Sequence, residues 1–159
     1  MLEEITDLGA REFFKANIYM ELADTISKLS KDPNTKVGAV IVKEGKILGI
    51  GYNGAPKYFP DKKVPTSHSE KISLDKNTYM IHAEINAILN SNGNLSDSTI
   101  FITHCPCYEC AKVISQAGIS TVVYQKEYKK EFTEVSNYIF KECGIKYYQL
   151  QEYLQEVCS

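Results

Sequence analysis

Two short motifs hold the residues of this 159-residue chain whose types and spacing could do chemistry. They are His82-Ala83-Glu84 and Pro106-Cys107-Tyr108-Glu109-Cys110. One imidazole and two thiolates make three protein ligands, the number that a catalytic zinc takes when its fourth position is left to water. A structural zinc would need a fourth protein ligand. The residue types therefore predict a catalytic zinc held by His82, Cys107 and Cys110.

Each motif is expected at the start of a helix. Cys107 and Cys110 are three residues apart, so one helical turn would place both sulfurs on the same side. A helix N-terminus favours negative charge and lowers a thiol pKa, and the thiolate is the form that binds metal. Pro106 suits a helix start because it has no N–H group to leave unpaired. Glu84 could move protons of the water only if it and His82 project from a helix end, since positions i and i+2 differ by about 200°.

The rest of the chain predicts the elements that position these motifs. An apolar stripe, Phe14, Ile18, Leu22, Ile26 and Leu29, predicts an amphipathic helix over residues 11–30. A hairpin of strands 37–42 and 47–52 is followed by helix 81–89, strand 99–103, helix 107–117, strand 120–124, helix 131–143, strand 145–150 and a short amphipathic tail. This order predicts one α/β domain over residues 1–159, a three-layer α/β/α sandwich with a mixed sheet of about five strands.

Residues 54–79 form a different kind of segment, with three of the five prolines and little apolar periodicity. A loop of this length inside a compact domain is usually functional or disordered. It contains His68, which could join a second metal site, although an exposed loop histidine is the preferred interpretation. His104 and Cys105 could extend the zinc site, but lining of a pocket is preferred for both.

The overall composition excludes several classes of partner. With 18 basic and 20 acidic side chains, the net charge of −2 offers no field for a long nucleic acid or an anionic membrane. No apolar run approaches the ~20 residues of a membrane span, and no signal peptide is evident. We therefore expect a cytoplasmic protein. In that reducing compartment its five cysteines are expected to bind metal or take part in catalysis rather than form disulfides.

His-x-Glu followed by Pro-Cys-x-x-Cys is identified as the signature of zinc nucleobase deaminases. Beyond the motifs, the chain resembles the deoxycytidylate (dCMP) deaminases over roughly residues 13–150. The resemblance is carried by segments 30–39, 51–56, 79–88 and 106–112. Asn86 and the Gly-Tyr-Asn-Gly of the second segment are typical of this family in particular.

The resemblance implies a cytidine deaminase-like fold and the hydrolysis of dCMP to dUMP and ammonia. It implies one zinc on His82, Cys107 and Cys110, with Glu84 moving a proton from the activated water to the ring N3 and then to the leaving amine. The implied substrate site comprises Asn53 for the sugar or base, the Val37, Gly38 and Ala39 backbone, and Ala83, Thr103, His104 and Pro106.

Regulation and assembly are also implied by the resemblance. Members of the family are often hexamers, activated by dCTP and inhibited by dTTP. The effector site is built partly from a loop that corresponds here to Gly51, Tyr52, Gly54 and Pro56.

Some alternatives stay open. Relatives tend to have Thr followed by two apolar or aromatic residues where this chain has Thr103-His104-Cys105, so dCTP or a 5-substituted dCMP is an alternative substrate. Arg11 is the only arginine, so lysines or backbone amides must bind the phosphate. A tRNA or polynucleotide deaminase is disfavoured by the net charge of −2. A binding module with structural zinc is disfavoured by the three-ligand set beside Glu84.

Overall fold

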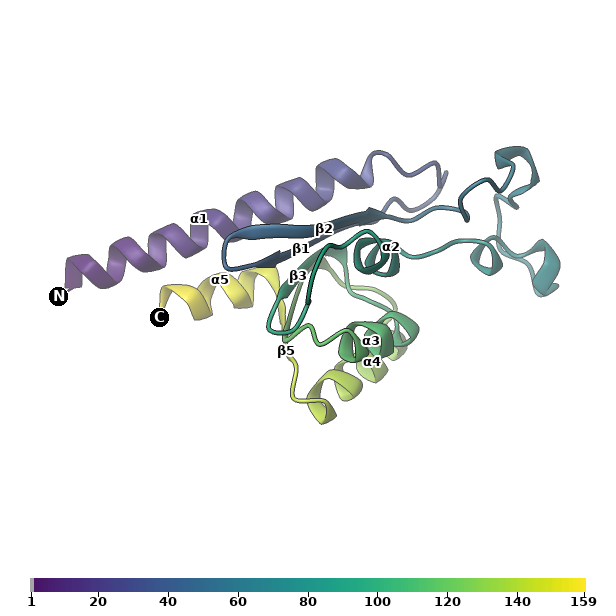
Figure 1. Ribbon diagram of the computed structural model, residues 1–159. Helices are drawn as coiled ribbons and strands as arrows, with labels where there is room; N and C mark the ends of the chain where they lie inside the picture. The colour runs from purple at the N-terminus through teal and green to yellow at the C-terminus, as the bar shows by residue number, and fades with distance from the viewer. Residues whose placement is uncertain (1) are drawn as a thin grey trace.

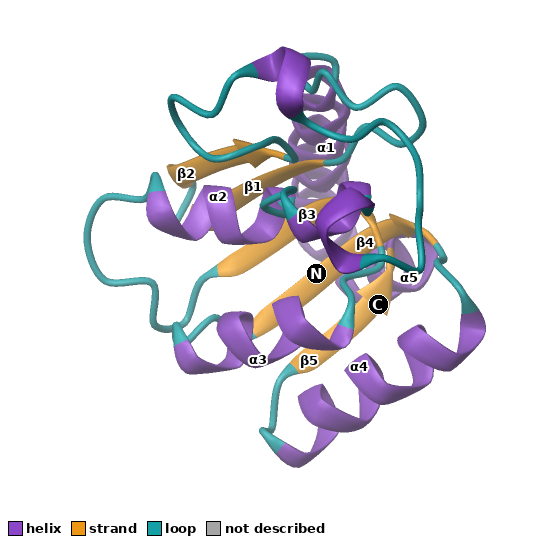
Figure 2. Cartoon of the chain, turned by 90° about the vertical axis from the view of Figure 1, so that its right-hand side faces the viewer, coloured by secondary structure: helices purple, strands orange, loops and turns teal. Residues whose placement is uncertain are grey.

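The computed structural model describes the backbone of residues 2–159 and the side chains of residues 7–159, and its strands form one mixed sheet. The strand order is β2-β1-β3-β4-β5; Figure 1 shows this sheet from its side, and Figure 2 shows it with every strand labelled. β1 (Gly38–Lys43) pairs antiparallel with both β2 (Lys46–Tyr52) and β3 (Thr99–His104). β3, β4 (Thr121–Lys126) and β5 (Lys146–Gln149) run parallel. The predicted hairpin and five-stranded mixed sheet are thus confirmed.

Helices cover both faces of the sheet (Figure 2). α1 (Leu2–Ser27) and α5 (Leu150–Cys158) lie on one face. α2 (Ala83–Leu89), α3 (Tyr108–Gln116) and α4 (Lys130–Glu142) lie on the other. This arrangement confirms the predicted three-layer α/β/α sandwich. Within residues 2–159, no helix combines the length and apolar character that a membrane span requires.

Each face of the sheet has its own apolar core, because successive strand residues point in opposite directions. Ile41 and Ile102 face the layer of α2 and α3, whereas their neighbours Val40 and Phe101 face α1 and α5. The apolar runs of β1 and β3 therefore mark strands that are buried on both sides, whereas the edge strand β2 is partly exposed.

The buried face of α1 differs from the apolar stripe that predicted the helix. Phe14, Ile18 and Leu29 are exposed, while α1 packs through small or flexible residues, Ala16, Met20 and Ala23. The physical reason is the close approach of α1 to Gly38, where an added Cβ would lie 1.9 Å from the carbonyl oxygen of Ala23. Large side chains cannot occupy such a contact. Leu22 of the predicted stripe still packs against this core, as does Tyr19, whereas Phe14 and Ile18 are exposed.

The long loop after β2 leaves the sheet and returns to it. Gly54 and Ile81 pair by two backbone hydrogen bonds of 3.0 and 2.8 Å, which close the base of the loop. Between them lie three short 3-10 helices, η1 (Asp61–Lys63), η2 (Ile72–Leu74) and η3 (Lys76–Thr78). The loop therefore delivers the chain directly to His82 and the start of α2.

Gly38→Ala should destabilise the protein. Its Cβ would meet the Ala23 oxygen and, at 2.8 Å, the Ser27 nitrogen, both of them backbone atoms of α1. Overpacking of this kind costs about 1–3 kcal/mol or more, which would lower the midpoint of urea unfolding. Gly54→Ala is the matched control, because no atom lies within 4 Å of its added Cβ. Equal midpoints for the two variants would contradict the prediction.

Candidate active site

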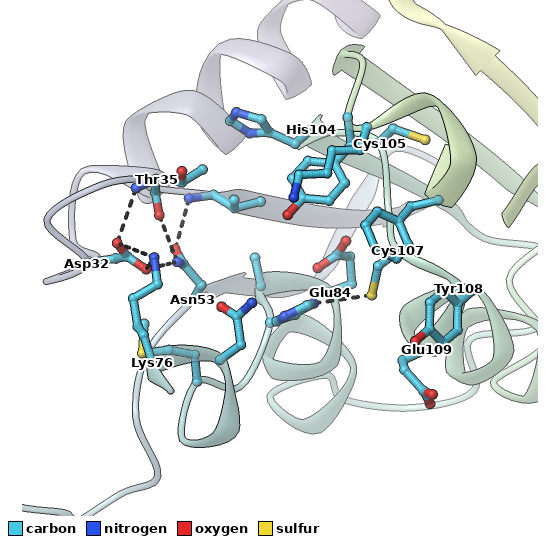
Figure 3. Close-up of a pocket in the computed structure, with 18 of the residues that line it drawn as sticks. Asp32, Thr35, Asn53, Lys76, Glu84, His104, Cys105, Cys107, Tyr108 and Glu109 are labelled. Atoms are coloured by element: carbon cyan, nitrogen blue, oxygen red, sulfur yellow. Dashed lines mark hydrogen bonds and ion pairs between the residues drawn. The ribbon is translucent and has the colours of Figure 1, made fainter. Parts of the chain in front are cut away.

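The starts of α2 and α3 meet beside a cavity at one edge of the sheet (Figure 3). β3 ends at His104 and leads into Cys107, which immediately precedes α3. The loop that closes at Ile81 leads into His82, which immediately precedes α2. The two sequence motifs, 25 residues apart, are thus brought together by the ends of two helices on the same face of the sheet.

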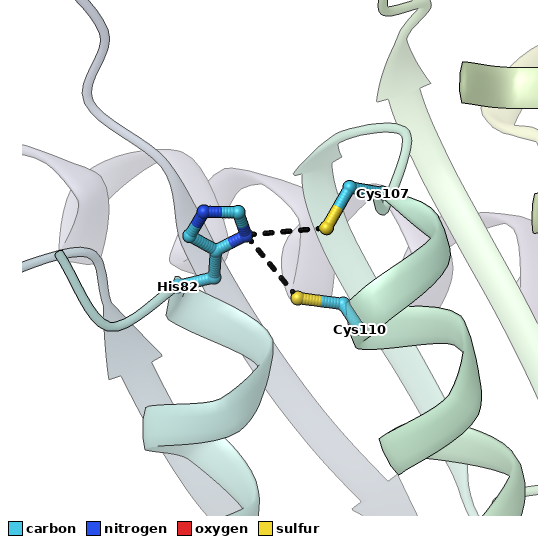
Figure 4. A group of neighbouring side chains, drawn as sticks. All are labelled: His82, Cys107 and Cys110. Carbon is cyan, nitrogen blue, oxygen red and sulfur yellow. Dashed lines mark hydrogen bonds between the residues drawn. The ribbon is translucent and has the colours of Figure 1, made fainter. Parts of the chain in front are cut away.

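His82, Cys107 and Cys110 converge on one point (Figure 4). His82 Nδ1 lies 3.4 Å from Cys107 Sγ and 3.3 Å from Cys110 Sγ. A tetrahedral zinc with the usual bond lengths of about 2.3 Å to sulfur and 2.0–2.1 Å to nitrogen would separate these atoms by about 3.5 Å. The three side chains therefore fit zinc, and Nδ1 is the imidazole atom that faces the metal position.

Two of the three ligands lie just outside a helix. His82 is the N-cap of α2, with φ −70° and ψ 154°, and Cys107 is the N-cap of α3, with φ −72° and ψ 167°. Because His82 is extended, the helical angle of about 200° between positions i and i+2 does not apply to Glu84. Likewise, Cys107 and Cys110 do not share a complete helical turn, yet both sulfurs face the imidazole.

The thiols and the imidazole influence one another strongly. The hydrogen bond with Cys110, helped by the contact with His82 and opposed by burial, lowers the pKa of Cys107 to about 4. The same hydrogen bond, together with burial, raises the pKa of Cys110. The hydrogen bond with Cys107 also raises the pKa of His82. Metal binding must displace the protons that these groups share, since thiolate and neutral imidazole are the ligating forms.

Glu84 is a buried carboxyl group on the wall of the cavity, only 4% exposed. Burial raises its pKa above the ordinary value, although the charge of nearby His82 acts in the opposite direction. A buried carboxyl group with a raised pKa holds a proton more readily than an exposed one, which favours both accepting and returning a proton during a reaction. Glu84 is therefore suited to general acid and base chemistry at this position.

The cavity has a volume of about 390 Å³, within the roughly 300–1,000 Å³ of small-molecule sites. The predicted site residues that line it are Val37, Asn53, His82, Ala83, Glu84, His104 and Cys107. Cys110 lies behind this wall and is fully buried. His104 and Cys105 also line this cavity.

Four residues of the predicted substrate site lie outside the cavity lining. The Gly38 N–H group donates to Thr103 Oγ1 at 3.1 Å, which ties β1 to β3. Ala39 is fully buried in the core between the sheet and α2. The Pro106 carbonyl accepts a hydrogen bond from Ser136 Oγ at 2.8 Å. These residues support the wall of the cavity from behind.

Other lining residues were missed by sequence reasoning. They are Asp32, Thr35, Lys76, Asn77, Met80, Glu109, Tyr128, Lys129 and Phe132. A signal existed for Tyr128 and Lys129, which follow the carboxyl end of β4, because ligands of α/β proteins bind at that edge of the parallel strands. Tyr108 also lines the cavity, whereas Tyr124 is buried outside the lining.

Two of the residues expected at an effector site, Gly51 and Tyr52, lie at the end of β2 and contact α2. An added Cβ on Gly51 would lie 2.3 Å from both the Ala83 oxygen and the Ala87 nitrogen. The Tyr52 carbonyl accepts a hydrogen bond from Asn86 Nδ2 at 2.8 Å. These residues, with Gly54 and Pro56, lie outside the cavity lining.

His68 lies at the cavity but away from the ligand cluster. Its Nδ1 is 3.7 Å from Asp75 Oδ2, and its side chain is mostly exposed. Across the part of the chain that the structure describes, the one group of three metal-binding side chains is His82, Cys107 and Cys110. The preferred interpretation of His68 as an exposed loop histidine agrees with these contacts.

Comparison with known proteins assigns the family. Residues 15–126 match the family model of the cytidine and deoxycytidylate deaminase zinc-binding region. The chain belongs to this family. The deaminase family match confirms the resemblance found in the sequence, and the segment that it covers contains His82, Cys107, Cys110 and Glu84.

Individual relatives extend the similarity beyond the zinc-binding region. The chain is 40% identical over 134 residues to deoxycytidylate deaminase of Mus musculus, covering 81% of this chain and 75% of that one. It is 41% identical over 148 residues to a probable deoxycytidylate deaminase of Drosophila melanogaster, covering 86% and 73%. The crystal structure of dCMP deaminase from the cyanophage S-TIM5, in complex with dCMP and dUMP, matches with a TM-score of 0.69 and 33% identity, covering 84% and 94%.

Cys110→Ser should lose tightly bound zinc, because a serine hydroxyl is a much weaker zinc ligand than a thiolate at neutral pH. Zinc would be measured by inductively coupled plasma mass spectrometry on protein purified by gel filtration. Cys143→Ser is the matched control, because Cys143 is exposed and lies outside the ligand cluster. Zinc content in Cys110→Ser equal to that of the control would refute this ligand assignment.

Proposed function

We propose that this chain catalyses the hydrolytic deamination of dCMP to dUMP and ammonia. The observation that carries the proposal is one cavity that joins the His82, Cys107 and Cys110 cluster to the buried carboxyl group of Glu84. The names of the mouse and fly relatives, and the dCMP and dUMP bound to the cyanophage enzyme, support a deoxycytidine mononucleotide as the substrate.

The metal ligands and Glu84 have different roles in the proposed reaction. Zinc bound by His82, Cys107 and Cys110 would supply the Lewis acidity that brings the pKa of a water towards neutrality. Glu84 accepts a proton from the attacking water and delivers it to N3 of the cytosine. It then takes the remaining proton from the new C4 hydroxyl and passes it to the leaving amine, so that C4 becomes a carbonyl. A C4–O bond forms, the C4–N bond breaks, and ammonia leaves. Burial of Glu84 favours its retention of the proton between these steps.

The substrate contacts belong to the same proposal. Asn53 Nδ2 donates to the Thr35 carbonyl at 2.9 Å, and Asn53 Oδ1 accepts from the Val37 N–H at 2.9 Å. One lone pair of Oδ1 is left for a hydroxyl of the sugar. Val37, Ala83 and His104 lie on the cavity wall where the base would bind, with Gly38, Ala39, Thr103 and Pro106 behind it. The unusual His104-Cys105 pair leaves dCTP or 5-substituted dCMP as the alternative substrate.

A deamination assay with dCMP, dCTP, deoxycytidine and 5-methyl-dCMP tests the proposal. Zinc-loaded protein should turn over dCMP best, and Glu84→Gln should reduce kcat by about 10²–10⁴-fold while zinc is retained. Glu131→Gln, an exposed position in α4, is the control. The proposal is wrong if none of the nucleotides is deaminated. Loss of zinc and of the fold together in Glu84→Ala would instead support a structural zinc module.

Assembly and regulation extend the proposal. Phe14 and Ile18 of α1 and Ile47 and Ile50 of the edge strand β2 are exposed apolar side chains, which supports burial against another copy of the chain. By resemblance we propose a homo-oligomer, a hexamer, that is activated by dCTP and inhibited by dTTP. The thiolate ligands suit a reducing compartment, so the proposed location is the cytoplasm.

Native mass spectrometry of the zinc-loaded protein checks the assembly. The wild type should form the hexamer, and the double variant Phe14→Ser with Ile18→Ser should shift the population towards smaller species, because it removes exposed apolar surface. Kinetic assays with dCTP and dTTP check the regulation in the same samples. A monomeric wild type at micromolar concentration would contradict the proposed oligomer, and rates unaffected by both nucleotides would contradict the effector site.

A further inference from the structure

A buried ion pair lies on the cavity wall opposite Cys107 and Tyr108 (Figure 3). Lys76 Nζ lies 3.0 Å from Asp32 Oδ2 and 3.1 Å from Asp32 Oδ1. The two side chains are only 6% and 3% exposed. Taking two charges out of water is costly, and removal of one partner would leave the other uncompensated. Such a pair at a cavity wall calls for an explanation beyond general stability.

Asp32 is saturated with donors. Besides Lys76, its Oδ1 accepts the backbone N–H groups of Asn34 at 2.8 Å and Thr35 at 3.1 Å. Its Oδ2 lies 3.5 Å from Asn53 Nδ2. Burial opposes the charge of Asp32, but the Asn34 and Thr35 N–H groups and Lys76 outweigh it, so its pKa lies below the ordinary value. The ammonium group of Lys76 is therefore paired with the ionised carboxylate of Asp32 inside the cavity wall, and each charge compensates the other.

Asn53 links Asp32 to the residues that line the cavity. The side-chain amide of Asn53 donates to the Thr35 carbonyl and accepts from the Val37 N–H group. The Ser30 hydroxyl donates to the backbone carbonyl of Asn53 at 2.8 Å. Thr35, Val37 and Asn53 all line the cavity. The orientation of the wall that receives the nucleotide thus depends on a network with Asp32 at its centre.

Lys76 connects the long loop to this network. It lies in η3, whose first turn is capped by Asp75 through a hydrogen bond from the Asn77 N–H group at 2.7 Å. Two other contacts tie the loop to residues 31–34, the Lys31–Asp61 ion pair and the hydrogen bond from Asn34 Nδ2 to the Thr66 carbonyl, and both are exposed. Exposed pairs contribute little. The buried pair is therefore the tether on which the position of the loop depends.

We propose that Lys76 and Asp32 are positioning residues for the nucleotide: together they hold the Thr35–Val37 backbone and the Asn53 amide in the geometry that binds substrate, without touching the reacting atoms. The inference rests on the proposed function. In this proposal the Lys76–Asp32 pair determines substrate affinity at one wall of the cavity, whereas the zinc cluster and Glu84 determine the rate of the chemical step.

Lys76→Met, assayed as the zinc-loaded protein, should raise KM about tenfold and leave kcat within about threefold. Because the effect acts through the wall, KM should rise by the same factor for dCMP and for deoxycytidine, which lacks the phosphate. Lys71→Met, an exposed lysine of the same loop, is the matched control and should resemble the wild type. Lys76→Arg keeps the charge and should recover part of the lost affinity.

The double variant Asp32→Asn with Lys76→Met tests whether the two residues act as a pair. Replacement of both charges is better tolerated than removal of one, so the double variant should lose no more affinity than the worse single variant, and it supplies folded protein if Lys76→Met does not fold. Additive losses would overturn the pairing. A loss confined to dCMP would instead make Lys76 a direct phosphate ligand. KM values within about twofold of Lys71→Met would overturn the proposal.

Hydrogen–deuterium exchange tests, independently of enzyme activity, whether the Lys76–Asp32 pair orders the Thr35–Val37 backbone. The amides of Thr35 and Val37, which donate to Asp32 and Asn53, should exchange faster in Lys76→Met than in Lys71→Met. Unchanged exchange over residues 35–37 would overturn the inference. A zinc-loaded wild type that deaminates no cytosine nucleotide would overturn the proposed function instead, while faster exchange would still support the role of the pair in ordering this wall.

Discussion

The close approach of α2 to the β1–β2 hairpin is the constraint on which the site depends. At Gly51 the strand comes so near the helix that a Cβ would lie 2.3 Å from its backbone atoms. His82 immediately precedes this helix and Glu84 lies in its first turn, so the depth of α2 on the sheet decides whether the imidazole reaches the two sulfurs at the start of α3. Backbone packing thereby sets the metal geometry before any ligand side chain is considered.

One cavity uses two buried carboxyl groups in opposite ways. Burial dominates at Glu84 and raises its pKa, whereas the N–H groups of Asn34 and Thr35, with Lys76, outweigh burial at Asp32 and lower its pKa. A group that readily takes up a proton suits chemistry, and a group that stays ionised suits the organisation of polar neighbours. The surroundings of each carboxylate, rather than its residue type, determine which of these roles it has.

The grouping of His82, Cys107 and Cys110 could be predicted because its information is local: each motif is short, and each sits at a helix start. The hairpin and the mixed sheet could be predicted from the apolar runs and their alternation with helices, but the strand order was not predicted. The buried face of α1 could not be predicted, because Ala16 and Ala23 pack closely where the larger Phe14 and Ile18 cannot. The Lys76–Asp32 pair joins residues 44 apart across an irregular loop, and no periodic pattern connects them.

His82 and Cys107 occupy the N-cap positions of α2 and α3, and neither side chain makes a capping hydrogen bond. A serine, threonine or aspartate at such a position typically stabilises a helix by about 0.5–2 kcal/mol. The chain forgoes this stabilisation at two helices that meet at the same point. Stability and metal recognition therefore compete for the same two positions, and the helix starts that present these side chains lack side-chain capping.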